Sequence, residues 1–354
     1  MAITAEAAGG IWSAGATWVG GVAPTAADDV LLTAASGNVT IDSATLCLGR
    51  SLNCTGYTGI LTNNASCTLI LGDGTAGAGN AILTMVNGMT YTLGNVNNSK
   101  IHFTSSSGTQ QTIDFANKVS GTVELPGGNY ILARDTSKNT SNWTTSGSVT
   151  FNTGSFNMTG NGSFIITNGT VTLGTSTITC STFTYTAGTL SAASSTISQN
   201  SSASTFTGGS QTFGTLTVGT SSTTSTITAA TFATLTVGAT AAKTNTLTLS
   251  GNIVVTGTFT VNGNSSVNRI CVKSNTVGTP RTISAAVVSS QNTDWQDITA
   301  SGAASWDLSA ITGLSGDCGG NTGITFTTAV PQFAIGITGS AKLWSEVANW
   351  STTT

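Results

Sequence analysis

Short strand-like segments recur along this chain about every 22 residues. The segments GTVTLG (169–174), GTLTVG (214–219) and ATLTVG (233–238) are nearly identical, and TLCLG (45–49) and TLILG (68–72) extend the series towards the N-terminus. With GSVTF (147–151), GTLSA (188–192) and GTFTVNG (257–263) included, neighbouring segments from residue 147 onwards start between 19 and 26 residues apart. Repeats of this length are typical of solenoid proteins, in which each unit buries its apolar face only against the next unit.

Within each segment, apolar and hydroxyl residues alternate. In GTVTLG, Val171 and Leu173 point to one side of a strand, while Thr170 and Thr172 point to the other. We therefore predict an all-β fold, a parallel β-helix (β-solenoid) with about a dozen turns and a length on the order of 60 Å. An array of β-sandwiches also has short strands and frequent turns, but its strands have no reason to repeat one pattern in phase.

The composition fits this fold and excludes some partners. Only 6% of the 354 residues are charged, against about 25% in ordinary soluble domains, so Thr, Ser and Asn must cover the surface. These residues favour strands and turns over helices. Because the ten Lys and Arg residues are scattered singly and the net charge is −3, we expect no nucleic-acid partner. No stretch approaches 18 consecutive apolar residues, so we expect no membrane insertion.

The six cysteines and the single histidine show no spacing typical of a metal site, so we expect no metal or other cofactor. We expect the cysteines to be buried or half-buried free thiols, with a disulfide such as Cys47–Cys67 as the alternative. The N-terminal MAITAEAAGG has neither the basic nor the apolar part of a secretory signal. The product is therefore expected to stay in the cytoplasm until lysis, unless a signal has been removed.

Composition also divides the chain into four parts. Residues 1–44 are predicted to be an N-terminal cap or attachment segment, and residues 45–268 the regular turns. Residues 269–340 concentrate charge, Cys, Pro and Trp, and are predicted to form larger, loop-decorated terminal turns. Residues 341–354 repeat the Trp-Ser-x4-Trp pattern of the N-terminal segment, so they form either a lid on the last turn or the entry of a further unit.

The N-terminal segment supplies the attachment candidates Trp12, Trp18, Asp28 and Asp29. The end of a solenoid exposes both core and strand edge, so this end needs a cover or a partner. The two adjacent acids are expected to form a turn or a strand entry, because adjacent side chains in a strand point to opposite faces.

The segment near the other end supplies the host-surface contact candidates Asp294, Trp295, Asp297 and Trp306. An exposed indole at position 295 would stack on a sugar, whereas a Trp folded back onto the rod would not. Sugar cleavage needs two carboxylates that face one another. Residues three apart in a strand do not converge, so we expect no catalytic residue here.

Three segments resemble parts of β-helical virion surface proteins of tailed bacteriophages, such as head fibres, capsid-decorating spikes and tail-associated fibres: SLNCTGYTGIL (51–61), QDITASGAA (296–304) and GDCGGNTGITFT (316–327). The opening pattern is also similar to the entry segment of many phage and bacterial surface β-helices. It comprises Trp12, Ser13, Trp18, Gly20, Gly21, Pro24, Asp28, Asp29 and Val30.

The resemblance implies a structural protein without enzymatic activity that decorates or cements the capsid or forms part of a surface fibre. It implies a homo-oligomer, with a trimer favoured, attached by one end to the major capsid protein or other virion proteins. Its expected location is the virion surface after assembly in the host cytoplasm, with a host-surface glycan as a further partner. A secreted bacterial β-helix adhesin and a polysaccharide-degrading tailspike are the alternative functions.

Overall fold

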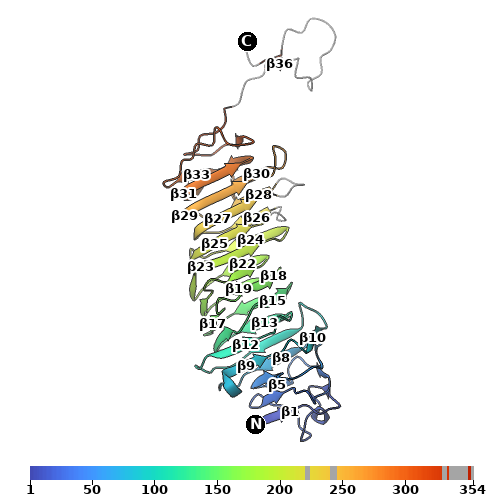
Figure 1. Cartoon of the computed structure of the whole chain (residues 1–354). Coiled ribbons are helices and arrows are strands. Elements are labelled where there is room, and N and C mark those ends of the chain that lie inside the picture. The colour runs from blue at the N-terminus through green and yellow to red at the C-terminus, as the bar shows by residue number, and fades with distance from the viewer. Residues whose placement is uncertain (220–223, 240–244, 329–332, 335–349, 352–354) are drawn as a thin grey trace, which may run out of the picture.

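The computed structural model describes residues 1–219, 224–239, 245–328, 333–334 and 350–351. About 13 turns of about 22 residues stack into a rod with almost no helix (Figure 1). The strands of successive turns pair in parallel throughout the stack. The prediction of an all-β parallel β-helix is therefore confirmed.

The strands form three faces along the rod. The first face contains β1 (Ala2–Thr4), β3 (Asp29–Leu31), β6 (Ser51–Asn53), β9 (Ala81–Thr84), β12 (Gln111–Asp114), β14 (Asn129–Leu132), β17 (Thr150–Asn152), β20 (Thr170–Thr172) and β33 (Ile298–Ser301). The second face contains β2 (Gly10–Ile11), β4 (Val39–Ile41), β7 (Ile60–Asn63), β10 (Thr90–Leu93), β15 (Thr136–Asn139), β18 (Met158–Gly160) and β21 (Thr177–Thr179). The third face contains β5 (Cys47–Gly49), β8 (Thr68–Leu71), β11 (Lys100–Phe103), β13 (Thr122–Leu125), β16 (Trp143–Thr145), β19 (Phe164–Ile166), β22 (Thr182–Tyr185), β24 (Ala203–Thr207), β26 (Thr224–Ile227), β28 (Asn245–Leu249), β30 (Ile270–Ser274), β32 (Thr293–Gln296) and β34 (Ser315–Asp317).

In the C-terminal half, single long strands cross both the first and the second face. They are β23 (Thr189–Gln199), β25 (Thr212–Val218), β27 (Ala230–Gly238), β29 (Ile253–Asn262) and β31 (Arg281–Gln291). The register shifts at the corner of these strands, as between Phe232 and Leu235 of β27. Such bulges bend a strand without breaking its ladder, so the two faces merge into one sheet.

The remaining elements are short. Two 3-10 turns, η1 (Gly15–Thr17) and η2 (Ala78–Asn80), lie in the N-terminal part, and an antiparallel pair, β35 (Phe333–Ala334) with β36 (Trp350–Ser351), follows the rod. Of residues 341–354, the structure describes only the backbone of 350–351. The choice between a lid and a further unit therefore lies outside the described residues.

Aromatic and aliphatic ladders fill the inside of the rod. Phe164, Phe183 and Phe206 occupy equivalent positions in three successive turns, with ring centroids 5.9 and 5.2 Å apart. All three side chains are buried. Equivalent positions of parallel strands lie about 4.8 Å apart, so identical side chains stack directly. This is the burial that the alternating pattern of the sequence predicts.

Hydroxyl side chains form matching ladders on the outside. Thr177, Thr196, Thr215 and Thr234 pair in register across four turns of the second face. The loops at the corners absorb the variation in turn length, so the strands keep their register. A surface of this kind explains how the rod is covered with so few charges.

Within the described part of the chain, no helix has the length and apolar character needed to cross a membrane.

Candidate functional site

Two tryptophans close the core at the N-terminal end of the rod. Trp12 and Trp18 are fully buried, with their rings edge to face and their centroids 5.0 Å apart. The indole Nε1 of Trp12 donates to the carbonyl of Leu48 at 3.1 Å, and that of Trp18 donates to the carbonyl of Trp12 at 2.8 Å. Because both indole N–H groups are hydrogen-bonded inside the protein, we infer that the two rings cover the core at the N-terminal end of the rod. They are called the plug below.

The acidic pair next to the plug fixes the entry into the first full turn. Asp28 accepts hydrogen bonds from the backbone N of Thr25 at 3.0 Å and from its Oγ1 at 2.6 Å. Burial acts to raise the pKa of Asp28, but these hydrogen bonds outweigh it and leave the pKa lowered. Asp29 accepts from Arg50 Nε at 2.9 Å and Ser51 Oγ at 2.5 Å, which ties two turns together. The expectation of a turn and strand-entry device is confirmed.

The four attachment candidates therefore have internal roles. Trp12, Trp18, Asp28 and Asp29 are all less than 9% exposed, so their side chains are not free to contact a partner. The structure corrects the prediction at this level of detail. Attachment through the segment 1–44 as a whole stays a prediction.

A second pair of tryptophans packs in the core near the C-terminal end of the described turns. Trp295 is fully buried in β32 and meets Trp306 edge to face, with centroids 5.9 Å apart. Their Nε1 atoms donate to Thr293 Oγ1 at 3.0 Å and to the Ser301 carbonyl at 2.9 Å. Of the two alternatives for Trp295, the structure shows the Trp folded back onto the rod, because its whole ring lies in the core. Trp306 is only 7% exposed and likewise lies in the core.

The two acids of this region also have internal partners. Asp294 forms a two-pronged ion pair with Arg269, whose Nε and Nη2 both lie 2.8 Å from its carboxylate oxygens. Asp297 is only 5% exposed and lies at a corner, where its Oδ2 accepts from the backbone N of Gly278 at 3.0 Å. These contacts correct the prediction of a host-surface role for Asp297. They leave Asp294 as a partly exposed member of an ion pair.

Exposed large apolar side chains gather towards the two ends of the rod. At the N-terminal end, Ile11, Val19 and Val22 are 47%, 57% and 64% exposed, and these three residues are called the apolar collar below. Among the described residues, none between Ile60 and Val254 exposes a large apolar side chain to this degree. Exposed apolar clusters mark contact surfaces in otherwise polar proteins. No pattern in the sequence marks the apolar collar, although both of its valines lie within four residues of Trp18.

A lysine lies inside the rod. Lys138 of β15 is fully buried, and its Nζ donates to the carbonyls of Gly160, Gly162 and Thr179 at 3.2, 3.4 and 2.8 Å. Burial lowers the pKa of Lys138 to about 8. The ammonium thus connects three successive turns, a role that nothing in the sequence around it indicated.

All six cysteines are free thiols, so the alternative of a Cys47–Cys67 disulfide is wrong. Cys47, Cys54 and Cys180 are buried, Cys67 and Cys271 are half-buried, and Cys318 is exposed, which differs from the expectation. Burial raises the pKa of the Cys47 and Cys180 thiols to about 12. Thiolate, the reactive form, is therefore scarce at these positions at neutral pH.

We predict that a thiol reagent such as Ellman's reagent labels one cysteine of the folded chain rapidly at pH 8. Cys318 supplies this fast phase, the half-buried Cys67 and Cys271 react more slowly, and the buried Cys47, Cys54 and Cys180 react only after unfolding. The change Cys318→Ser removes the fast phase. Two or more fast equivalents in the wild type would contradict the burial described above.

Within the described ranges, no three His, Cys, Asp or Glu side chains gather in a way that could hold a metal ion. The fold defines the class of the molecule, a β-solenoid rod. No protein-family model, curated protein or solved structure shows significant similarity to this chain.

Proposed function

We propose that this chain is a structural protein of a bacteriophage virion, a rod that decorates or cements the capsid or forms part of a surface fibre. The observation that carries the proposal is the apolar collar at the sealed N-terminal end of a rod whose middle is covered by hydroxyl groups. The other end also exposes apolar side chains, among them Val267 and Val277, so the choice of the N-terminal end for attachment rests on the opening pattern, and the shaft between the two ends faces water. The resemblance of the opening pattern to phage β-helices agrees with this direction of attachment.

The environment of the carboxylates supports a role without catalysis. Asp29, Asp114 and Asp294 are each paired with an arginine, as in the contact of 2.7 Å between Asp114 and Arg134 Nη2. A glycosidase needs two carboxyl groups that face one another across a substrate, with one of them protonated. The carboxylates of Asp29, Asp114 and Asp294 thus each contact a guanidinium group rather than a second carboxyl group.

The surface chemistry suits a particle exposed outside cells. Ten Lys and Arg residues in 354 leave few sites for trypsin-like proteases, and strand pairing protects the backbone between them. The proposed partners are the major capsid protein or another virion protein at the N-terminal end. Further copies of this chain, in a homotrimer, would lie alongside.

The collar provides the test of this proposal. In particles that incorporate the chain, the triple change Ile11→Ser, Val19→Ser and Val22→Ser is expected to lower the copy number at least tenfold. Quantitative mass spectrometry of purified particles measures this number. The matched control is Val267→Ser with Val277→Ser, two exposed loop valines near the other end, and it leaves the copy number unchanged.

Two results would overturn the proposal. One is the absence of the wild-type chain from purified particles. The other is full incorporation of the collar variant, provided that its circular dichroism spectrum and melting temperature match those of the wild type.

A further inference from the structure

Asparagine is followed by glycine at four places in the chain, and this dipeptide can modify itself. The backbone N of the glycine attacks the side-chain amide carbon of the asparagine, because glycine has no Cβ to hinder the approach. The structure divides the four pairs into two classes. They are Asn87-Gly88, Asn161-Gly162, Asn168-Gly169 and Asn262-Gly263.

In two pairs the glycine donates a backbone hydrogen bond to a neighbouring turn. The N of Gly162 donates to the Asn139 carbonyl at 3.0 Å, and the N of Gly263 donates to the Gln291 carbonyl at 2.8 Å. Both glycines are buried. Each of these hydrogen bonds must open before the nitrogen can attack. The pairs 161–162 and 262–263 are called the bonded pairs below.

The pair Asn87-Gly88 lies in the turn between β9 and β10. Both residues are exposed, and the N of Gly88 donates to no group of the described chain. The turn is closed instead by the N of Met89, which donates to the Val86 carbonyl at 3.3 Å. The nitrogen that would attack is therefore not engaged in a hydrogen bond within the described chain.

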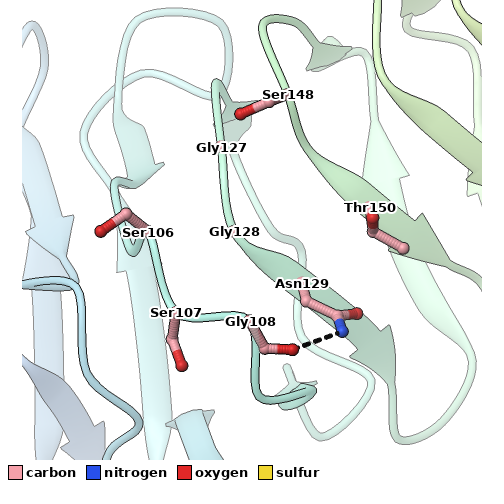
Figure 2. Close-up of a pocket in the computed structure, with 8 residues that line it drawn as sticks. All are labelled: Ser106, Ser107, Gly108, Gly127, Gly128, Asn129, Ser148 and Thr150. Carbon is pink, nitrogen blue, oxygen red and sulfur yellow. Dashed lines mark hydrogen bonds between the residues drawn. The ribbon is translucent and has the colours of Figure 1, made fainter.

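The pair Asn168-Gly169 lies at the corner between β19 and β20. Figure 2 shows this corner in the three preceding turns, where segments 106–108, 127–129 and 148–150 run side by side. Asn168 is exposed, and the N of Gly169 donates to no group of the described chain. The pairs 87–88 and 168–169 are called the open pairs below.

We infer that Asn87 and Asn168 are sites of spontaneous deamidation in the folded rod, whereas the bonded pairs are protected. The glycine nitrogen gives up its proton and bonds to Cγ of the asparagine. The Cγ–Nδ2 bond breaks, and the amide nitrogen takes up a proton and leaves as ammonia. The five-membered succinimide then takes up one water molecule. Hydrolysis at Cγ gives aspartate, and hydrolysis at the backbone carbonyl carbon gives isoaspartate.

The modification adds charge to a surface that has little. Each conversion replaces a neutral amide with a carboxylate, so conversion of both open pairs takes the net charge of the chain from −3 to −5. Isoaspartate also lengthens the backbone by one carbon atom. Loops tolerate such insertions better than the elements they connect, so we expect both corners to accept it. The inference goes beyond the proposed function, because it concerns the chain alone.

The test follows the four asparagines while the purified chain is incubated at pH 8. Peptide mapping by mass spectrometry measures the fraction of each that has become aspartate or isoaspartate, and the released ammonia measures the total. The open pairs are expected to convert about tenfold faster than the bonded pairs. This ratio corresponds to about 1.4 kcal/mol of activation free energy, close to what one well-formed backbone hydrogen bond contributes.

Two controls separate the effect of the structure from that of the local sequence. In concentrated urea, where the turns are unfolded, all four pairs are expected to convert at similar rates. In the folded chain, Gly88→Ala is expected to slow the conversion of Asn87 about tenfold, because the methyl group hinders the nitrogen, and to leave Asn168 unaffected. The fold accepts this alanine, since a Cβ at 88 meets no atom closer than 3.8 Å and the φ is not left-handed.

Equal rates at the open and the bonded pairs of the folded chain would overturn the inference. A lack of conversion at Asn87 or Asn168 would do the same, as would a difference between the pairs that persists in urea. Because the experiment uses the purified chain alone, none of these results bears on the virion proposal.

Discussion

Replacing Trp12 with alanine is expected to destabilise the N-terminal turns by about 4 kcal/mol, because large-to-small changes of fully buried aromatics cost about this much. The change removes the ring that packs on Trp18 and the hydrogen bond to the Leu48 carbonyl. In a solenoid each turn is stabilised by its neighbours, so damage at one end opens that end first. Hydrogen exchange measured by mass spectrometry should show faster exchange in β1 to β5, with little change beyond β20.

The neighbouring residue supplies the control for this experiment. Ile11→Ala removes an exposed apolar side chain from the same segment and is expected to leave exchange in the first turns unchanged. Trp306→Ala is expected to reverse the pattern and open the C-terminal turns. Uniform acceleration along the whole rod in Trp12→Ala would contradict the assignment of this residue as a local plug.

Replacing Lys138 with methionine is expected to cost about 3 kcal/mol, because buried carbonyls lose their hydrogen-bond donor. The carbonyls of Gly160 and Thr179 would lose the ammonium as a donor, and so would that of Gly162, which also accepts from the backbone N of Ser181 at 3.3 Å. Methionine fills nearly the same volume, so the loss reflects the polar contacts rather than a cavity. Urea unfolding of the two proteins at pH 7 measures the difference. Equal midpoints would contradict the role of the ammonium as a link between turns.

The pH dependence of this difference follows from the lowered pKa. Lys138 has a pKa of about 8 in the folded chain against an ordinary value of 10.5, because burial disfavours its charged form. Between these two pH values the unfolded chain binds more protons than the folded one, so the stability of the folded chain rises with pH. The advantage of the wild type over Lys138→Met should therefore grow from pH 8 to pH 10.5 and stay constant below pH 8. An advantage that falls over this range would contradict the lowered pKa.

The fold was predictable because the same strand pattern recurs many times along the chain. Segments such as GTLTVG carry both the strand period and the turn residue, and each copy supports the same register. The long strands that merge two faces were not predictable in the same way. Their merging depends on bulges at the corner, as at Phe232 to Leu235, which leave no signature in a sequence of alternating threonines.

The functional residues were harder to predict, because the sequence shows which residues are unusual but not where they point. Trp295 is a candidate contact residue in the sequence because it lies in a charged segment, but its side chain is fully buried in the core. Nothing in the sequence around Val19 and Val22 marks them, yet their side chains are 57% and 64% exposed. Lys138 lies among serines and asparagines, and only the stacking of three turns brings carbonyl groups to its ammonium. Exposure and contacts between turns are properties of the stack, so single segments cannot reveal them.

Electron cryomicroscopy of particles purified from the lysate that contains this chain tests the proposed function most directly. We expect rod-shaped density on the particle surface into which about 13 turns fit. The end with Trp12, Trp18 and the apolar collar should lie against the particle, and the end with Trp295 and Trp306 should point away. Particles without such density, or rods attached by the opposite end, would contradict it.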